Sequence, residues 1–169
     1  MKYNTIVICV LSLILFGCSK TNSIDSTKYE GRHLEIAVIG EKKLGIHPNV
    51  SFIHTELESL LQNKNTQYDA LIITKDYFSE ADKDRYSSFF TNLNYPVFFL
   101  GLEGYQDFAF TQAGVSLKNA KDDNGAYTQG FKYNADGTKQ QWDFYLPNDS
   151  SPDESTDNSM LYRIFNAIN

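Results

Sequence analysis

The sequence holds 169 residues, of which 41% are apolar and 14% are aromatic. This length suits one domain with a real core, and the apolar content excludes a disordered chain, whose signature is low hydrophobicity with high charge. The net charge of −6 argues against nucleic acid as a partner, because phosphate binding needs a clustered positive surface. Two cysteines, Cys9 and Cys18, are too few for a disulfide framework.

The first residues have the pattern of an export signal. Lys2 supplies a short positive segment, and an uncharged, mostly apolar run follows from Thr5 to Phe16. This run is too short to cross a bilayer as a helix, which takes about 20 residues, but it fits the apolar part of a signal peptide. It ends in Leu15-Phe16-Gly17-Cys18, which resembles the lipobox of bacterial lipoproteins.

This resemblance implies a signal peptide over 1–17, removed by cleavage before Cys18. Cys18 would then carry acyl chains such as palmitate and hold the protein on the extracytoplasmic face of the cell membrane, because two or three chains bind a bilayer far better than one. Residues 18–32 would be the lipidated cysteine and a flexible tether, and 33–169 a single domain in the cell envelope. The alternative is an uncleaved N-terminal anchor in which Cys18 is incidental.

Four apolar segments predict buried strands, because each is rich in β-branched or aromatic residues and is bounded by polar residues, proline or glycine. These segments are 34–40, 50–53, 69–74 and 97–100. Near-continuous apolar runs of this kind are typical of a parallel sheet that is covered on both faces.

Helical patterns alternate with these strands. Residues 55–65 place three leucines on one face, and Thr55 and Glu58 have the spacing of a capping box. Ser79 is expected to cap the next helix, which carries aromatic residues at three- and four-residue spacing, and a short helix is expected over 105–113. The alternation predicts an α/β fold with a mostly parallel, doubly wound sheet flanked by helices.

The pattern changes in the last third of the chain. A short strand is expected at 115–117, and two aromatic runs, 127–133 and 140–146, flank Asp136-Gly137, which is a C-terminal β-hairpin signal. A calcium loop is the alternative for this turn, but the later acidic ligand of an EF-hand is missing from the sequence. Residues 159–168 predict a closing amphipathic helix.

Few motifs in the sequence point to chemistry. His33, His47 and His54 lack close ligand spacing, so neither a metal nor another cofactor is expected. The sequence has no Gly-x-Ser-x-Gly elbow, no Gly-x-Gly-x-x-Gly motif and no Walker loop, so a hydrolase nucleophile and a phosphate cradle are unsupported.

One segment resembles a known family. From Pro96 to Gly114 the sequence predicts a strand, the turn Gly101-Leu102-Glu103-Gly104 and a helix. Here the chain resembles the class I glutamine amidotransferase-like fold, in which a strand leads into Gly-Ile-Cys-x-Gly-His-Gln with the cysteine nucleophile at a sharp elbow. That family carries Phe-His-Pro-Glu further on, and Tyr145-Leu146-Pro147-Asn148 stands in a comparable place.

The resemblance covers the order of elements over most of 34–168 and departs at the catalytic residues. Glu103 stands about where the cysteine would be, and Leu146 and Asn148 stand where the histidine and glutamate would be. Glutamine hydrolysis through a thioester is therefore impossible. The resemblance implies a degenerate member without its catalytic triad, and the alternative is a generic doubly wound sheet.

Ligands of open α/β sheets bind at the carboxyl ends of the strands. The candidate residues for such a ligand crevice are Glu103, Tyr105, Gln106, Asp76 and Tyr77. The alternative for Glu103 is a solvated loop carboxylate without a binding role.

Two functions stay open. The first is a non-catalytic binding or interaction domain, whose partner is an envelope protein or a small ligand. Aromatic residues of the expected hairpin would offer contact area, unless Phe131, Trp142 and Phe144 are all buried. The alternative is a hydrolase-type enzyme of unknown substrate, in which Glu103 acts as general acid or base.

Overall fold

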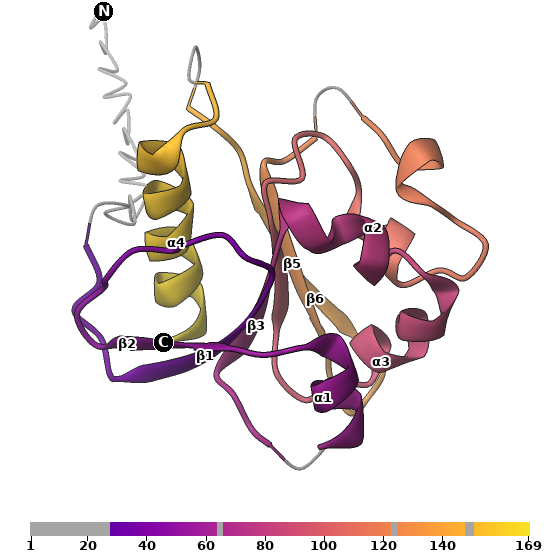
Figure 1. Ribbon diagram of the computed structural model, residues 1–169, viewed down its shortest axis with the longest axis horizontal. Helices are drawn as coiled ribbons and strands as arrows, with labels where there is room; N and C mark the ends of the chain where they lie inside the picture. Colours follow the sequence, from indigo (N-terminus) through magenta and orange to yellow (C-terminus); the bar gives the residue numbers. More distant parts are fainter. Residues whose placement is uncertain (1–27, 64–65, 123–124, 148–150) are drawn as a thin grey trace, which may run out of the picture.

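The computed structural model describes residues 28–63, 66–122, 125–147 and 151–169 (Figure 1). They form an α/β fold around a six-stranded sheet with the order β2-β1-β3-β4-β5-β6. The strands are β1 (Leu34–Ile39), β2 (Val50–His54), β3 (Ala70–Thr74), β4 (Val97–Leu100), β5 (Thr128–Tyr133) and β6 (Lys139–Phe144). The helices are α1 (Leu57–Gln62), α2 (Phe78–Ala81), α3 (Ser87–Thr91) and α4 (Glu154–Ile168), and 3-10 turns occur at η1 (Lys75–Tyr77), η2 (Asp84–Tyr86), η3 (Asp107–Phe110) and η4 (Leu117–Asn119).

The sheet is mixed. β1 pairs in parallel with β2 and β3, and β3 pairs in parallel with β4. β5 runs antiparallel to both of its neighbours, β4 and β6. The predicted α/β class is confirmed, with antiparallel pairing over the C-terminal third of the sheet.

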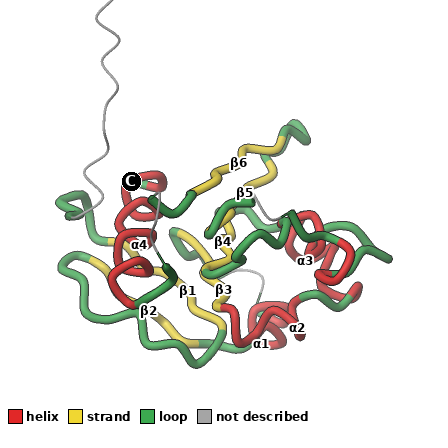
Figure 2. The backbone as a smooth tube through the Cα atoms, turned by 90° about the horizontal axis from the view of Figure 1, so that it is seen from above, coloured by secondary structure: helices red, strands yellow, loops and turns green. Residues whose placement is uncertain are grey.

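Apolar residues alternate between the two faces of the sheet, as expected for a period of two. Ala37, Ile39 and their neighbours on β3 and β4 pack against the side that carries α1, α2 and α3. Ile36 and Val38 pack against α4, which lies on the opposite side of the sheet (Figure 2). The amphipathic α4 therefore covers one face, and the short helices cover the other.

The short helices differ from the predicted ones. The capping box expected at Thr55 and Glu58 does not form among the described residues, because α1 begins later, with Glu56 as its N-cap. Ser79 was predicted to cap a helix and instead lies inside α2. The helix predicted over 105–113 is a single 3-10 turn, η3.

The prediction of a strand at 115–117 was also wrong, since η4 begins at Leu117 within this segment. Asp82 accepts hydrogen bonds from the Leu117 N–H at 3.2 and 3.1 Å, and Asp84 accepts one from the Gly114 N–H at 2.9 Å. These aspartates bind the backbone donors that a strand would use for pairing. They therefore fix the segment as a loop over the helical face.

The predicted tether joins the domain before residue 33. Tyr29 is 4% exposed and its ring lies 5.6 Å from that of Phe165 on α4. Its hydroxyl donates to the Arg32 carbonyl at 2.8 Å and lies 3.0 Å from Asn169 Oδ1. The segment from Tyr29 to Arg32 is thus held against the C-terminal end of α4.

Candidate functional site

The strand order places a topological switch point between β1 and β3. The chain leaves β1 toward α4, because Leu44 and His47 of the β1–β2 connection lie on the α4 side. It leaves β3 toward the other face, where Phe78 of α2 is buried. In open α/β sheets, ligands bind in the crevice that opens where neighbouring connections diverge in this way.

A cavity of about 720 Å³ lies at this point, beside the carboxyl ends of β1, β2 and β3. This volume is within the range of about 300–1,000 Å³ typical of small-molecule sites. Its lining is mostly polar and consists of Gly40, Glu41, His54, Thr55, Glu56, Ser59, Asp76 and Tyr77. We refer to it as the carboxyl-edge crevice.

Asp76 ties the two diverging loops together. Its carboxylate accepts a hydrogen bond from the Glu41 N–H at 2.7 Å and another from the Thr74 hydroxyl. Partial burial disfavours the charged form, but these hydrogen bonds outweigh it and lower the pKa of Asp76 below its ordinary value. The Asp76 carboxylate is therefore charged at neutral pH and already engaged.

Gly40 allows this close approach. It has a φ of +115°, and a Cβ placed there would lie 2.0 Å from Thr74 Oγ1. Only glycine fits a backbone in this conformation and at this distance from β3.

Tyr77 and Glu56 also line the crevice. Burial raises the pKa of Tyr77 above its ordinary value, and the nearby carboxylates of Glu58 and Glu56 raise it further. The Tyr77 hydroxyl thus stays protonated as a hydrogen-bond donor. Glu41 and Glu56 are exposed, so the crevice presents carboxylates to solvent.

The structure divides the predicted site residues into two groups. Asp76 and Tyr77 line the carboxyl-edge crevice, and Glu103, Tyr105 and Gln106 do not. Glu103 lies 2.5 Å from Lys75 Nζ in an exposed ion pair. Tyr105 and Gln106 hold the loop after β4 in place. The backbone of Tyr105 forms an antiparallel β-bridge with Lys121, and Gln106 Oε1 accepts a hydrogen bond from Gln129 Nε2 at 3.4 Å.

Glu103 has an unusual backbone conformation. Its φ is +49°, between Gly101 at +90° and Gly104 at +93°. A left-handed residue other than glycine costs about 1 kcal/mol or more and is held only where the surroundings impose it. The turn after β4 is therefore sharp, and the Glu103 side chain is a carboxylate paired with Lys75.

Most residues of the crevice are not among those predicted from the sequence. Gly40 and Glu41 directly follow β1, and His54, Thr55 and Glu56 lie at the end of β2. The rule that ligands bind at carboxyl ends of strands could have found them. The predicted residues come only from the loops after the third and fourth strands.

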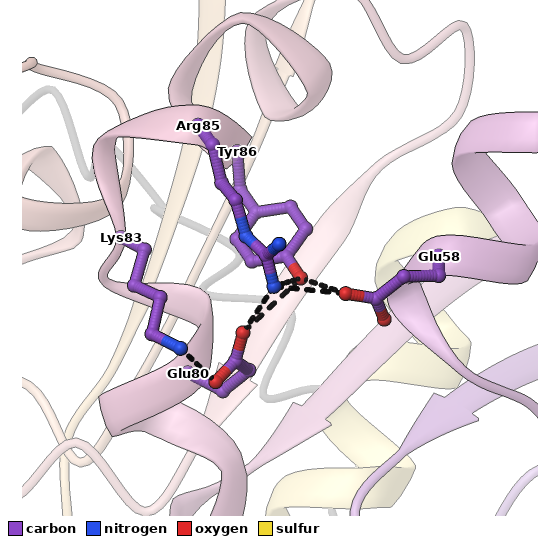
Figure 3. A network of polar contacts seen from close by, with 5 residues as sticks. All are labelled: Glu58, Glu80, Lys83, Arg85 and Tyr86. Carbon is purple, nitrogen blue, oxygen red and sulfur yellow. Dashed lines mark hydrogen bonds and ion pairs between the residues drawn. The ribbon is translucent and has the colours of Figure 1, made fainter.

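A second polar cluster lies beside the crevice and links α1 to α2 and η2 (Figure 3). Tyr86 donates its hydroxyl to Glu58, and Arg85 Nη2 lies 2.9 Å from Glu58 and 2.6 Å from Glu80. Lys83 pairs with Glu80 as well. Two carboxylates and two cations thus pair within this cluster, which has the character of a structural clamp.

The aromatic residues predicted for hairpin contacts are partly core. Phe131 is fully buried, whereas Trp142 and Phe144 are half-buried. The Trp142 ring lies 5.3 Å from that of Phe98. Since only one of the three is fully buried, Trp142 retains an exposed part.

Within the described ranges, no group of three histidine, cysteine or acidic residues is placed to hold a metal ion. Nor is any helix there long and apolar enough to cross a membrane. The predicted lipobox with Cys18, and also Asn148, lie outside the described residues. Comparison with protein-family models, curated proteins and solved structures found no match to this chain.

Proposed function

We propose that this protein is a membrane-anchored extracytoplasmic lipoprotein whose domain binds a small polar ligand in the carboxyl-edge crevice without catalysis. The observation that carries the proposal is a cavity of about 720 Å³ at the switch point, lined by carboxylates and hydroxyl groups. The lipobox motif ending at Cys18 supports the anchor.

We also propose that the scaffold is a degenerate, amidotransferase-like fold. In this interpretation β1 to β4 are a doubly wound parallel core, β5 and β6 are its C-terminal hairpin, and α4 is the closing helix. The sharp, left-handed turn at Glu103 after β4 supports it. The carboxylate at this position, where the family has a cysteine, supports the loss of amide hydrolysis.

The charges of the crevice indicate the class of ligand. Glu41 and Glu56 line the cavity with Asp76, and Lys42 is a cation that acts on the Asp76 carboxylate. Such a lining favours amines and hydroxyl groups and disfavours anions. The ligand is therefore a small molecule with amino groups, such as a polyamine, or with amino and hydroxyl groups together, such as an amino sugar.

A hydrolase that uses Glu103 is the second candidate. It is favoured by the left-handed backbone at Glu103, since proteins often hold such strain at functional sites. The Lys75 ion pair weighs against it, because a general acid or base must be free to exchange its proton.

Titration calorimetry of the full chain in detergent with glucosamine and spermidine tests the binding proposal. We expect saturable binding of an amine, with gluconate and citrate giving none. Glu56→Gln should weaken binding about tenfold, which corresponds to about 1.4 kcal/mol. Glu103→Gln is the matched control, with the same chemical change outside the crevice, and should bind as the wild type does.

Equal heats with amines and anions would contradict this ligand class. Loss of binding in Glu103→Gln, but not in Glu56→Gln, would move the site to the loop after β4. The mass of the same preparation tests the anchor independently: we expect a chain that starts at Cys18 and carries acyl groups, and an uncleaved, unmodified chain would contradict it.

A further inference from the structure

A second hollow lies at the opposite edge of the sheet from the crevice. It measures about 320 Å³, and its residues come from directly before β1, β3 and β4, from β5 and β6, and from the last turn of α4. Those used below are Arg32, Tyr68, Lys132, Trp142 and Ile168. We call this surface the amino-edge hollow.

The chain enters the domain beside this hollow. The Lys28 carbonyl accepts a hydrogen bond from Asn166 on α4 at 3.4 Å, and Tyr29 packs on the same helix. Arg32, three residues after Tyr29, lines the hollow. Lys28 is the tenth residue after Cys18, and a flexible chain of that length spans about 17 Å.

We infer that the amino-edge hollow is the surface on which the domain rests against the anionic lipid head groups of the membrane that holds it. This inference rests on the proposed lipid anchor. A tether of this length keeps the point of entry within reach of the bilayer, so the surface around that point meets it most often.

The composition of the hollow fits a lipid–water interface. Tryptophan and tyrosine prefer the head-group level, because one end of each side chain is apolar and the other is polar. Trp142, Tyr68 and Ile168 are half-buried here, so part of each reaches solvent. Lys132 supplies a positive charge for the anionic head groups, whereas Arg32 shares its charge with Asp69 at 2.6 Å.

The charges at the two edges of the sheet also favour an orientation with the amino-edge hollow against the lipid. The carboxyl-edge crevice presents Glu41, Glu56 and Asp76, which a negative membrane surface repels. With the amino edge against the lipid, these carboxylates point away from the bilayer. The crevice then opens toward the surrounding compartment, where a small ligand can enter it.

Fluorescence of Trp142, which is the only tryptophan of the chain, tests this orientation. The full chain is placed in phosphatidylcholine–phosphatidylglycerol vesicles with or without brominated acyl chains near the head group. Bromine quenches tryptophan only at close range. We expect the brominated vesicles to lower Trp142 emission by about half or more if the indole lies at the interface.

In brominated vesicles, the Lys132→Glu variant should lose much less emission than the wild type, because the substitution removes the attraction to phosphatidylglycerol. Lys118→Glu is the matched control, with the same charge change on an exposed residue of η4, and should be quenched as the wild type is. Unchanged emission of vesicle-bound protein, or equal quenching of the two variants, would overturn the inference.

The test separates this inference from the lipid anchor. An uncleaved chain would still be held in the vesicles by its apolar run from Thr5 to Phe16, so Trp142 quenching reports on the surface in either case. The mass of the protein reports on Cys18. A lipidated chain without quenching would contradict the inference and leave the anchor standing.

Discussion

At the scale of single residues, Gly130 shapes the middle of the sheet. A Cβ at this position would lie 2.1 Å from Phe98 Cδ1, so the Phe98 ring crosses β5 directly over the glycine. The ring then reaches Trp142 at 5.3 Å and stacks on Phe144 at 6.3 Å. The glycine thus allows aromatic contacts that run across three strands.

We predict that Gly130→Ala lowers the free energy of unfolding by about 1–3 kcal/mol, the usual cost of overpacking a core. Urea unfolding of the purified protein measures it. Gly114→Ala is the control: it also adds one methyl group, but a Cβ placed there would meet nothing within 4 Å. Its φ of +81° should cost about 1 kcal/mol through backbone strain alone.

A double variant identifies the cause. Phe98→Leu removes the atoms that the new methyl group would meet, so Gly130→Ala should cost less in that background than in the wild type. Additive losses in the double variant would show that the Phe98 ring is not the obstacle.

At the scale of elements, the Tyr86 cluster joins α1 to the segment between β3 and β4. Burial raises the pKa of Tyr86 well above its ordinary value, and the hydrogen bond to Glu58 raises it further. The Tyr95 side chain, which is also buried, has its pKa raised to about 12. In the unfolded chain these phenols ionise near pH 10.

The stability should therefore depend on alkaline pH. The unfolded chain releases these protons first, so the free energy of unfolding is fully present below about pH 10 and decreases as pH rises toward the folded pKa values. Tyr86→Phe should lower stability by about 1 kcal/mol at pH 8, through the lost hydrogen bond, but make the alkaline decrease shallower. Urea unfolding from pH 8 to 11 measures both effects.

Tyr145→Phe provides the comparison for Tyr86→Phe. Tyr145 is 55% exposed, so the loss of its hydroxyl should change neither the stability at pH 8 nor the slope. A Tyr86→Phe protein with the wild-type slope would contradict the role given to the buried phenol.

The elements differ in how far the sequence predicts them. The predicted strands at 34–40, 50–53, 69–74 and 97–100 coincide closely with β1 to β4, because apolar runs bounded by breaking residues are local signals. The connections are set by distant partners. The hydrogen bonds that Asp82 and Asp84 accept from the backbone N–H groups of Leu117 and Gly114 are not visible as a sequence pattern.

The candidate site shows the same limit. Asp76 and Tyr77 were predicted because they follow a clear strand, and the structure places both in the crevice. Their neighbours Glu41 and Glu56 belong to other connections. They meet Asp76 only because β1 lies between β2 and β3, an order that the strand patterns do not specify.

At the scale of the whole molecule, the segment before β1 is part of the folded domain. Tyr29 contacts Phe165 and its hydroxyl reaches Asn169, so it closes the α4 side of the core. We predict that Tyr29→Ala lowers the free energy of unfolding by about 3 kcal/mol, as for other large aromatic residues removed from a core. Thermal unfolding of the full chain measures the loss.

Tyr145→Ala removes the same atoms from an exposed site and should change stability by less than about 0.5 kcal/mol. Equal stability of the Tyr29→Ala and Tyr145→Ala proteins would place Tyr29 in the tether instead of the domain.

The contact between Tyr29 and Asn169 also brings two points far apart in the sequence to one place in space. A short linker from Asn169 back to Lys28 would close the described domain into a ring. The exposed turn at 134–138, between β5 and β6, is then a natural place to open it. In such a circular permutant every strand keeps its neighbours, so the order in which the elements are connected can be varied separately from the way they pack.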